Sequence, residues 1–147
     1  MIKGNAQVMS ISFFVTTSKE FKLKKVILSI RPEYVREILN TNKQYEYRKT
    51  AFSKEVHCIL IYETSPIKMV VAEAEIRSTI IGSPKEVWSI TKDFSGISES
   101  AFFEYYNGCN IAVAYALGNV HKFEKPKALE EYGIHRAPQS FIYISRW

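Results

Sequence analysis

The chain has 147 residues, of which 46% are hydrophobic and 14% are aromatic, enough to fill the core of a single domain. Its 20 Lys and Arg residues against 15 Asp and Glu residues give a net charge of +5, which favours polyanions as partners, although many proteins use such a charge only for solubility. The two cysteines form no C-x-x-C pattern, so neither a disulfide framework nor a zinc site is expected. A reducing, cytoplasmic compartment is the expected location.

The N-terminal residues 1–24 differ from the rest of the chain. They combine a short apolar run, VMSISFFVTT, with a charged run, KEFKLKK. The apolar run is too short to span a bilayer, and no small-x-small cleavage pattern of a signal peptide follows it, so no membrane segment is expected. We predict that residues 1–24 form an extension, as an extra strand, an ordered arm or an upstream addition, to a domain at residues 25–147. An apolar strand there could pair with another chain and make the protein an oligomer or an interaction domain.

The first elements of the domain are a strand and a short helix. KVILSI, residues 25–30, is a nearly all-apolar run bounded by charge, which predicts a buried strand. Pro32 then suits the first turn of a helix, and Val35, Ile38 and Leu39 recur at helical spacing until Asn40.

From Lys43 the pattern changes to a period of two. In KQYEYR, Tyr45 and Tyr47 fall on one face of a strand, and Glu46 and Arg48 fall on the other. VHCILIY predicts a central strand, and KMVVAEAEIRSTII predicts a longer one with a bulge where its alternation slips. Such closely spaced strands favour a mostly antiparallel, curled sheet.

The second half of the domain alternates helices and strands. Ser83, Pro84 and Glu86 form a capping box that begins a helix, with Val87, Trp88 and Ile90 expected on its packing side. A second helix is expected from Ser98 to Gly108, with a packing stripe of Ala101, Phe102, Tyr105 and Tyr106. A strand at NIAVAYALGNV, a helical turn at KALEEYG and a terminal strand at QSFIYISRW, which could close a barrel, complete the chain.

The pattern K-x-x-E-x-R at Lys43, Glu46 and Arg48 is the strongest candidate for a site. The glycines are scattered, so no phosphate loop is present, and the three histidines share no ligand spacing, so neither a metal nor a cofactor is expected. An arginine held by a glutamate is oriented to offer its remaining donors to a phosphate or a base edge, and a nearby lysine adds positive charge. The alternative is a salt bridge that binds no ligand.

Four separated runs of the sequence resemble the ASCH family, a branch of the PUA-like fold. They are VILSIRPEYVREILNTNKQYEYRK, IYETSPIKMVVAEAEI, GSPKEVWSITKDFSGISESAFFEYYNG and FEKPKALEEYGIHRAPQSFIYI. The likeness covers about residues 25 to 145 and is to stand-alone prokaryotic members described as predicted transcriptional regulators. It implies an α+β fold, a small mostly antiparallel β-barrel with short covering helices.

The resemblance also implies a cleft beside the first helix that binds RNA, another nucleic acid or a modified nucleoside. Carried onto this chain, the cleft draws on residues from several segments: Ser29, Arg31, Pro32, Lys43, Glu46, Arg48, Tyr62, Ser65, Pro66, Arg136, Gln139 and Ser140. Several also have purely structural explanations. Pro32 begins a helix, Ser65 and Pro66 suit a turn, and Tyr62 ends an apolar strand and could belong to the core instead of stacking on a base.

Some relatives of the family are enzymes, including an amidohydrolase branch that uses a lysine, a threonine and a glutamate. Lys43 matches the lysine, whereas Glu46 stands in place of the threonine, and the glutamate falls near Asp93 to Ser95 without a clear equivalent. The hydroxyl nucleophile is therefore absent. A hydrolase or ribonuclease that uses Lys43 and Glu46 as an acid–base pair is the alternative to a binding domain.

Overall fold

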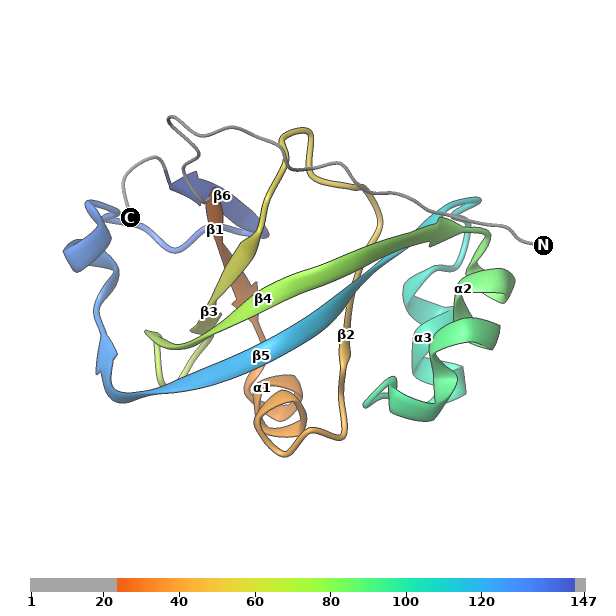
Figure 1. Cartoon of the computed structure of the whole chain (residues 1–147), viewed down its shortest axis with the longest axis horizontal. Helices are drawn as coiled ribbons and strands as arrows, with labels where there is room; N and C mark the ends of the chain where they lie inside the picture. Colours follow the sequence, from red (N-terminus) through yellow and green to blue (C-terminus); the bar gives the residue numbers. More distant parts are fainter. Residues whose placement is uncertain (1–23, 145–147) are drawn as a thin grey trace.

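The computed structural model describes residues 24–144, which form a six-stranded sheet with the order β2-β5-β4-β3-β1-β6 (Figure 1). The strands are β1 (Lys25–Ile30), β2 (Tyr45–Arg48), β3 (Cys58–Glu63), β4 (Met69–Gly82), β5 (Ala112–Lys127) and β6 (Phe141–Ile144). Only β1 and β3 pair in parallel, and the other pairings in this part of the chain are antiparallel. The prediction of a mostly antiparallel sheet is confirmed. The predicted extension at residues 1–24 lies almost wholly outside the described residues.

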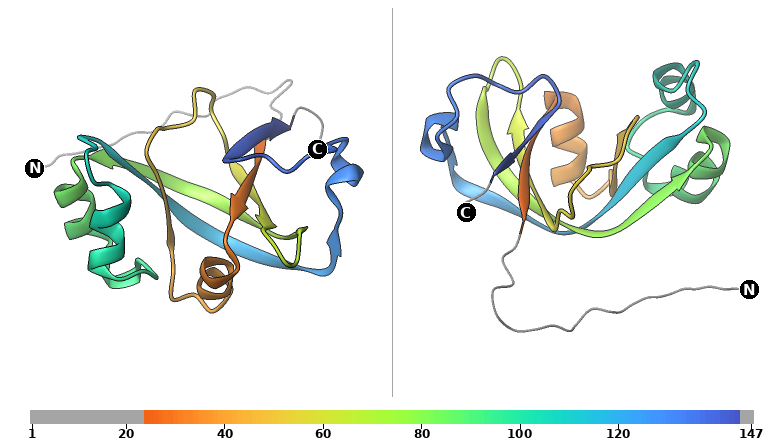
Figure 2. Two further views of the ribbon diagram at one scale, coloured as in Figure 1. Left: turned by 180° about the vertical axis from the view of Figure 1, so that it is seen from behind. Right: turned by 90° about the horizontal axis from the view of Figure 1, so that it is seen from above.

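The sheet curls because its two longest strands are irregular. The pairing of β4 with β5 shifts register between Val70 and Ala72, and again on both sides of Ile76. Each such bulge bends a strand and increases its twist, and Figure 2 shows the sheet curving into a trough. The terminal strand β6 pairs with β1 and not with β2, so the predicted α+β barrel is a curled half-barrel with an open seam between its two edge strands.

Short helices flank the trough. They are α1 (Pro32–Leu39), α2 (Pro84–Thr91) and α3 (Glu99–Tyr105), with short 3-10 turns at η2 (Lys92–Phe94) and η3 (Leu129–Tyr132). Both α1 and α2 begin at the prolines that the sequence places in their first turns. Ser83 and Glu86 form the predicted capping box, and the Ser98 side chain caps α3. Figure 1 shows α2 and α3 together at one end of β4 and β5, with α1 below the middle of the sheet.

Two positions on these helices differ from the prediction. Ile90 is 61% exposed, because the inward face of α2 runs through Val87 and Thr91, one turn apart, and Thr91 fills the position expected for Ile90. Tyr105 is 40% exposed, whereas Phe102 and Tyr106 of the same predicted stripe are buried. The stripe on α3 is therefore narrower than the sequence suggests.

The start of β2 is tied to the loop between η2 and α3. Lys43 and Ser95 form an isolated antiparallel bridge, and the Gln44 amide donates to the Phe94 carbonyl at 2.8 Å. The next residue of this loop, Gly96, has φ +68°, and a Cβ placed on it would lie 2.3 Å from the Lys43 Cβ. Only glycine fits here, both for its backbone conformation and for the close approach of Lys43.

Replacing Gly96 therefore tests how the loop holds Lys43. Gly133 is a matched control, because it has φ +76° but no atom within 4 Å of an added Cβ. Gly133→Ala should lower the unfolding free energy by about 1–2 kcal/mol, because alanine is strained in the left-handed backbone conformation. Gly96→Ala should cost a further ~1–3 kcal/mol from the clash, measured by urea unfolding. Equal losses in the two variants would contradict the close contact.

Candidate functional site

The polar side chains of β2 face a cavity of about 500 Å³. Its walls come from the end of β1, the start of α1, β2, the loop before α3 and α3 itself. From the set predicted from the sequence, it contains Ser29, Arg31, Lys43, Glu46 and Arg48. The period-two pattern of β2 correctly places Glu46 and Arg48 together.

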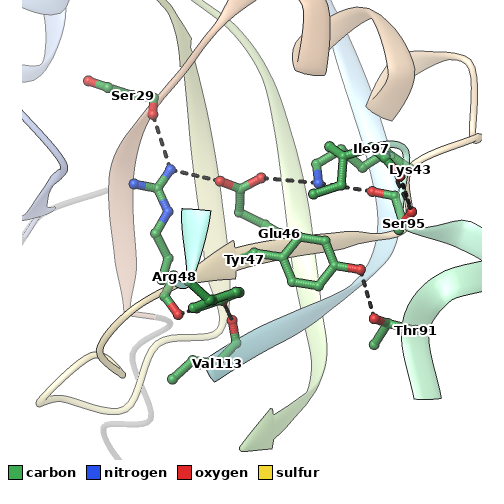
Figure 3. Close-up of polar contacts among 10 residues, drawn as sticks. Ser29, Lys43, Glu46, Tyr47, Arg48, Thr91, Ser95, Ile97 and Val113 are labelled. Carbon is green, nitrogen blue, oxygen red and sulfur yellow. Dashed lines mark hydrogen bonds and ion pairs between the residues drawn. The ribbon is translucent and has the colours of Figure 1, made fainter. Parts of the chain in front are cut away.

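Arg48 links the two edges of the sheet through its guanidinium group. Its Nη2 donates to Glu46 Oε2 at 2.7 Å and to the Ser29 carbonyl of β1 at 3.1 Å (Figure 3). Its Nη1 donates to Ser140 Oγ at 3.2 Å, just before β6. Ser29 itself donates from its hydroxyl to the Pro138 carbonyl at 2.7 Å. Side chains therefore bridge the seam that the backbone leaves open.

Lys43 lies on the other side of the Glu46 carboxylate, and its side chain is 3% exposed. Its Nζ donates to the Ser95 carbonyl at 3.1 Å and lies 4.0 Å from Glu46 Oε1 (Figure 3). Burial lowers the pKa of Lys43 to about 8, with a smaller contribution from Arg48, and the attraction of Glu46 opposes the shift. The site therefore holds a carboxylate between two cations, and one of these cations can lose its charge in mildly alkaline solution.

Two buried tyrosines anchor β2 to its surroundings. The Tyr47 hydroxyl lies 2.7 Å from Thr91 Oγ1 of α2, and its ring lies under Lys43, with 4.6 Å between Nζ and the ring centroid. Burial raises the pKa of Tyr47 to about 12, so this hydroxyl stays protonated. The Tyr106 hydroxyl lies 2.8 Å from the Arg48 carbonyl. These contacts fix the backbone from which Glu46 and Arg48 project.

The remaining predicted residues do not line this cavity. Tyr62 is 5% exposed and packs in the core with Leu60, Val70 and Leu129. Pro32 is the first residue of α1, and Ser65 and Pro66 form the turn between β3 and β4. Arg136 and Gln139 lie in the exposed segment before β6 and do not line the cavity. Ser140, from the same segment, is connected to the site by its hydrogen bond with Arg48.

Sequence reasoning missed the aromatic walls of the cavity. Tyr34 of α1 and Tyr105 of α3 both line it, as do Ala101 and Glu104. Ala101 and Tyr105 are four residues apart and share one face of α3, while Phe102 and Tyr106 share the buried face. If the predicted packing stripe had been limited to Phe102 and Tyr106, Ala101 and Tyr105 would have been free to be assigned to the cavity.

Other kinds of site find no support in residues 24–144. In that range no group of three His, Cys, Asp or Glu side chains is placed to hold a metal ion. Nor does any helix there combine the length and the apolar character that a bilayer span requires. Cys58 is buried in β3, and burial raises the pKa of its thiol to about 11, as for a side chain that packs as a hydrophobe.

Known proteins resemble the chain in sequence and in structure. No protein-family model matches it. The crystal structure of ASCH from Zymomonas mobilis superposes with a TM-score of 0.75 and 24% identity, over 83% of this chain and 88% of that one. The ASCH domain-containing ribonuclease of the same species is 27% identical over 128 residues, 84% of this chain and 86% of that protein. The chain has the ASCH fold. The resemblance predicted from the sequence is confirmed.

Another relative is much longer than this ASCH-fold chain. The large ribosomal subunit protein uL22 of Ureaplasma parvum is 29% identical over 146 residues, which are 98% of this chain and 47% of that protein. The chain thus spans about half the length of the first curated relatives that it matches.

In this ASCH-fold chain, the loop before α3 gives Lys43 a backbone partner. Ser95 offers its backbone carbonyl to Lys43 Nζ. Its side chain is turned away, and its Oγ donates to the Ile97 carbonyl at 2.8 Å. The acidic partner of Lys43 is Glu46, three residues further along the chain in β2.

The lowered pKa of Lys43 makes stability depend on pH. Because its pKa falls from 10.5 in the unfolded chain to about 8 in the folded protein, the unfolded state binds more protons between these values. The unfolding free energy of the parent minus that of Lys43→Met should therefore increase by up to about 3 kcal/mol between pH 7 and pH 10. Urea unfolding at several pH values measures this, with Lys125→Met on the exposed part of β5 as control. A difference that does not change with pH would exclude a low pKa for Lys43.

Proposed function

We propose that the central cavity binds one nucleoside, either as a unit of single-stranded RNA or as a free modified nucleoside. The observation that carries this proposal is the Glu46–Arg48 pair, which places a carboxylate acceptor beside a guanidinium donor in a cavity with aromatic walls. A base edge offers the same mixture of donors and acceptors.

The size and the walls of the cavity suit a base. Its volume of about 500 Å³ lies in the usual range for small-molecule sites. Tyr105 lines it with a ring that is 40% exposed, and stacking on such rings is how proteins bind unpaired bases without reading their sequence. Within residues 24–144, Tyr34 has two cations on its ring, Arg31 and Lys43, at 5.4 and 5.5 Å from the ring centroid, whereas Tyr105 has one, Lys49, at 4.9 Å. Tyr105 is also the more exposed of the two residues, and it is therefore the stacking surface.

The polar groups of the cavity are held in place before any ligand arrives. Arg48 is fixed by Glu46, Ser29 and Ser140, so binding immobilises little further side-chain freedom. Its Nε is buried and has no hydrogen-bond partner within the described part of the chain. The relative from Zymomonas mobilis whose name is ASCH domain-containing ribonuclease supports RNA as the class of ligand. A role in gene regulation stays a prediction.

Binding can be tested with fluorescein-labelled ten-nucleotide RNAs of mixed sequence at low salt. Lys43→Ala and Arg48→Ala should weaken binding about tenfold or more, because each removes a charged donor from the cavity. Arg31→Ala is a second test that leaves the seam intact, since the Arg31 side chain is 66% exposed. Lys125→Ala lowers the net charge equally and should have little effect. If no RNA bound, or if all variants bound alike, the proposal would be wrong.

A hydrolase that acts on RNA or an acylated nucleoside is the second candidate. It is favoured by Lys43, whose pKa of about 8 and position 4.0 Å from Glu46 suit an acid–base pair. In such a step the Glu46 carboxylate accepts a proton from the attacking group, and the Lys43 ammonium donates one to the leaving group. Both Glu46 and Lys43 line the cavity.

The pH profile of turnover tests this second candidate. If Lys43 is the acid, kcat/KM for a labelled RNA should fall as the pH rises through about 8, because the ammonium is lost. Lys43→Arg keeps the positive charge but cannot release a proton, so it should lose turnover together with Lys43→Ala and Glu46→Ala. Equal rates for the parent and Lys43→Ala would identify a contaminating activity and remove the enzyme from consideration.

A further inference from the structure

A second, smaller cavity adjoins the central one along the seam. Its volume is about 170 Å³, and it lies between the end of β2, the residues that follow it and the start of β6. Arg48 and Tyr105 line both cavities, so the two spaces adjoin at these side chains. The second cavity also contains Lys49, Thr50, Phe52, Ser140 and Phe141.

The two cavities differ in charge. The central cavity sets Arg31, Lys43 and Arg48 against Glu46 and Glu104, and Glu46 contacts both Lys43 and Arg48. The second cavity has Arg48 and Lys49 and no acidic residue among those that line it. An anionic group is therefore better placed in the second cavity, and a neutral polar group in the central one.

The second cavity also offers uncharged donors. Ser140 Oγ accepts a hydrogen bond from Arg48 Nη1, which leaves its own hydrogen to donate. The Thr50 hydroxyl lines the same space. Lys49 Nζ lies 4.9 Å from the centroid of the Tyr105 ring, at the boundary between the cavities. Ammonium, guanidinium and hydroxyl groups together are the usual partners of a phosphate.

We propose that the second cavity binds a phosphate of the nucleotide whose base occupies the central cavity. The inference rests on the proposed function and makes it more specific. The ligand is then a nucleotide, free or within an RNA chain, with its base against Tyr105 and its phosphate between Lys49 and Arg48. The charge of the second cavity, with Arg48 and Lys49 and no acidic residue in its lining, favours a phosphate over a second base.

The salt dependence of RNA binding tests the phosphate site. For the labelled ten-nucleotide RNAs, Lys49→Ala should weaken binding about fivefold at ~50 mM salt and lower the slope of log Kd against log salt by about 0.7, the value for one phosphate of a single strand. Lys125→Ala should change neither the affinity nor the slope by a comparable amount. Lys49 is exposed and closes no seam, so the variant should fold normally, as a thermal melt can verify.

Small ligands separate this inference from the proposed function. The four ribonucleosides and their 5′- and 3′-monophosphates are titrated by calorimetry, and the ratio of nucleotide to nucleoside affinity is compared between the parent and Lys49→Ala. A fall in that ratio supports the phosphate site, and the isomer that loses more identifies the phosphate concerned. RNA binding that depends on Lys43 and Arg48 but not on Lys49 would overturn the phosphate site alone. Binding that depends on none of them would overturn both proposals.

Discussion

The ion pair between Arg48 and Glu46 is the interaction on which the seam and the site both depend. Among the described residues, β2 and β6 are the edge strands of the sheet and share no ladder, so side chains must hold the edges together. Glu46 is 8% exposed and Arg48 is 16% exposed, and removing such charges from water costs more than their mutual attraction restores unless further hydrogen bonds assist. Ser29 and Ser140 supply those bonds from across the seam, Ser29 from β1 and Ser140 from the residue before β6.

This arrangement gives the same atoms a structural and a chemical role. Arg48 closes the half-barrel, and it also forms the wall between the two cavities. Removing it would leave Glu46 with only the distant Lys43 as a charged partner, so lost binding and lost stability would appear together. Variants at Arg31 and Lys49 separate these effects, because both side chains are exposed and lie outside the seam.

Local sequence patterns predicted the helices and strands well, whereas the contacts that build the site depend on the order and curl of the strands. The proline and serine caps fixed where α1 and α2 begin, and the alternation of KQYEYR placed Glu46 beside Arg48. No local pattern indicates that Arg48 meets Ser140, 92 residues away, because this contact follows from the curl of the sheet and its strand order. Tyr105 was expected in the core for a similar reason: helical spacing defines a stripe, but not which part of the stripe faces a cavity.

Of the two cations beside Glu46, Lys43 is the one whose charge a ligand can change. It is held in a nearly dry position by the Ser95 carbonyl and Glu46, and burial lowers its pKa to about 8. A ligand that covers the cavity removes more water and disfavours the ammonium further, unless it places an acceptor near Nζ. A base edge with an acceptor beside Lys43 therefore preserves the charge, and one with a donor there favours the neutral amine. If the proposed nucleotide site is correct, selectivity among bases rests on Lys43, and the phosphate contributes only affinity.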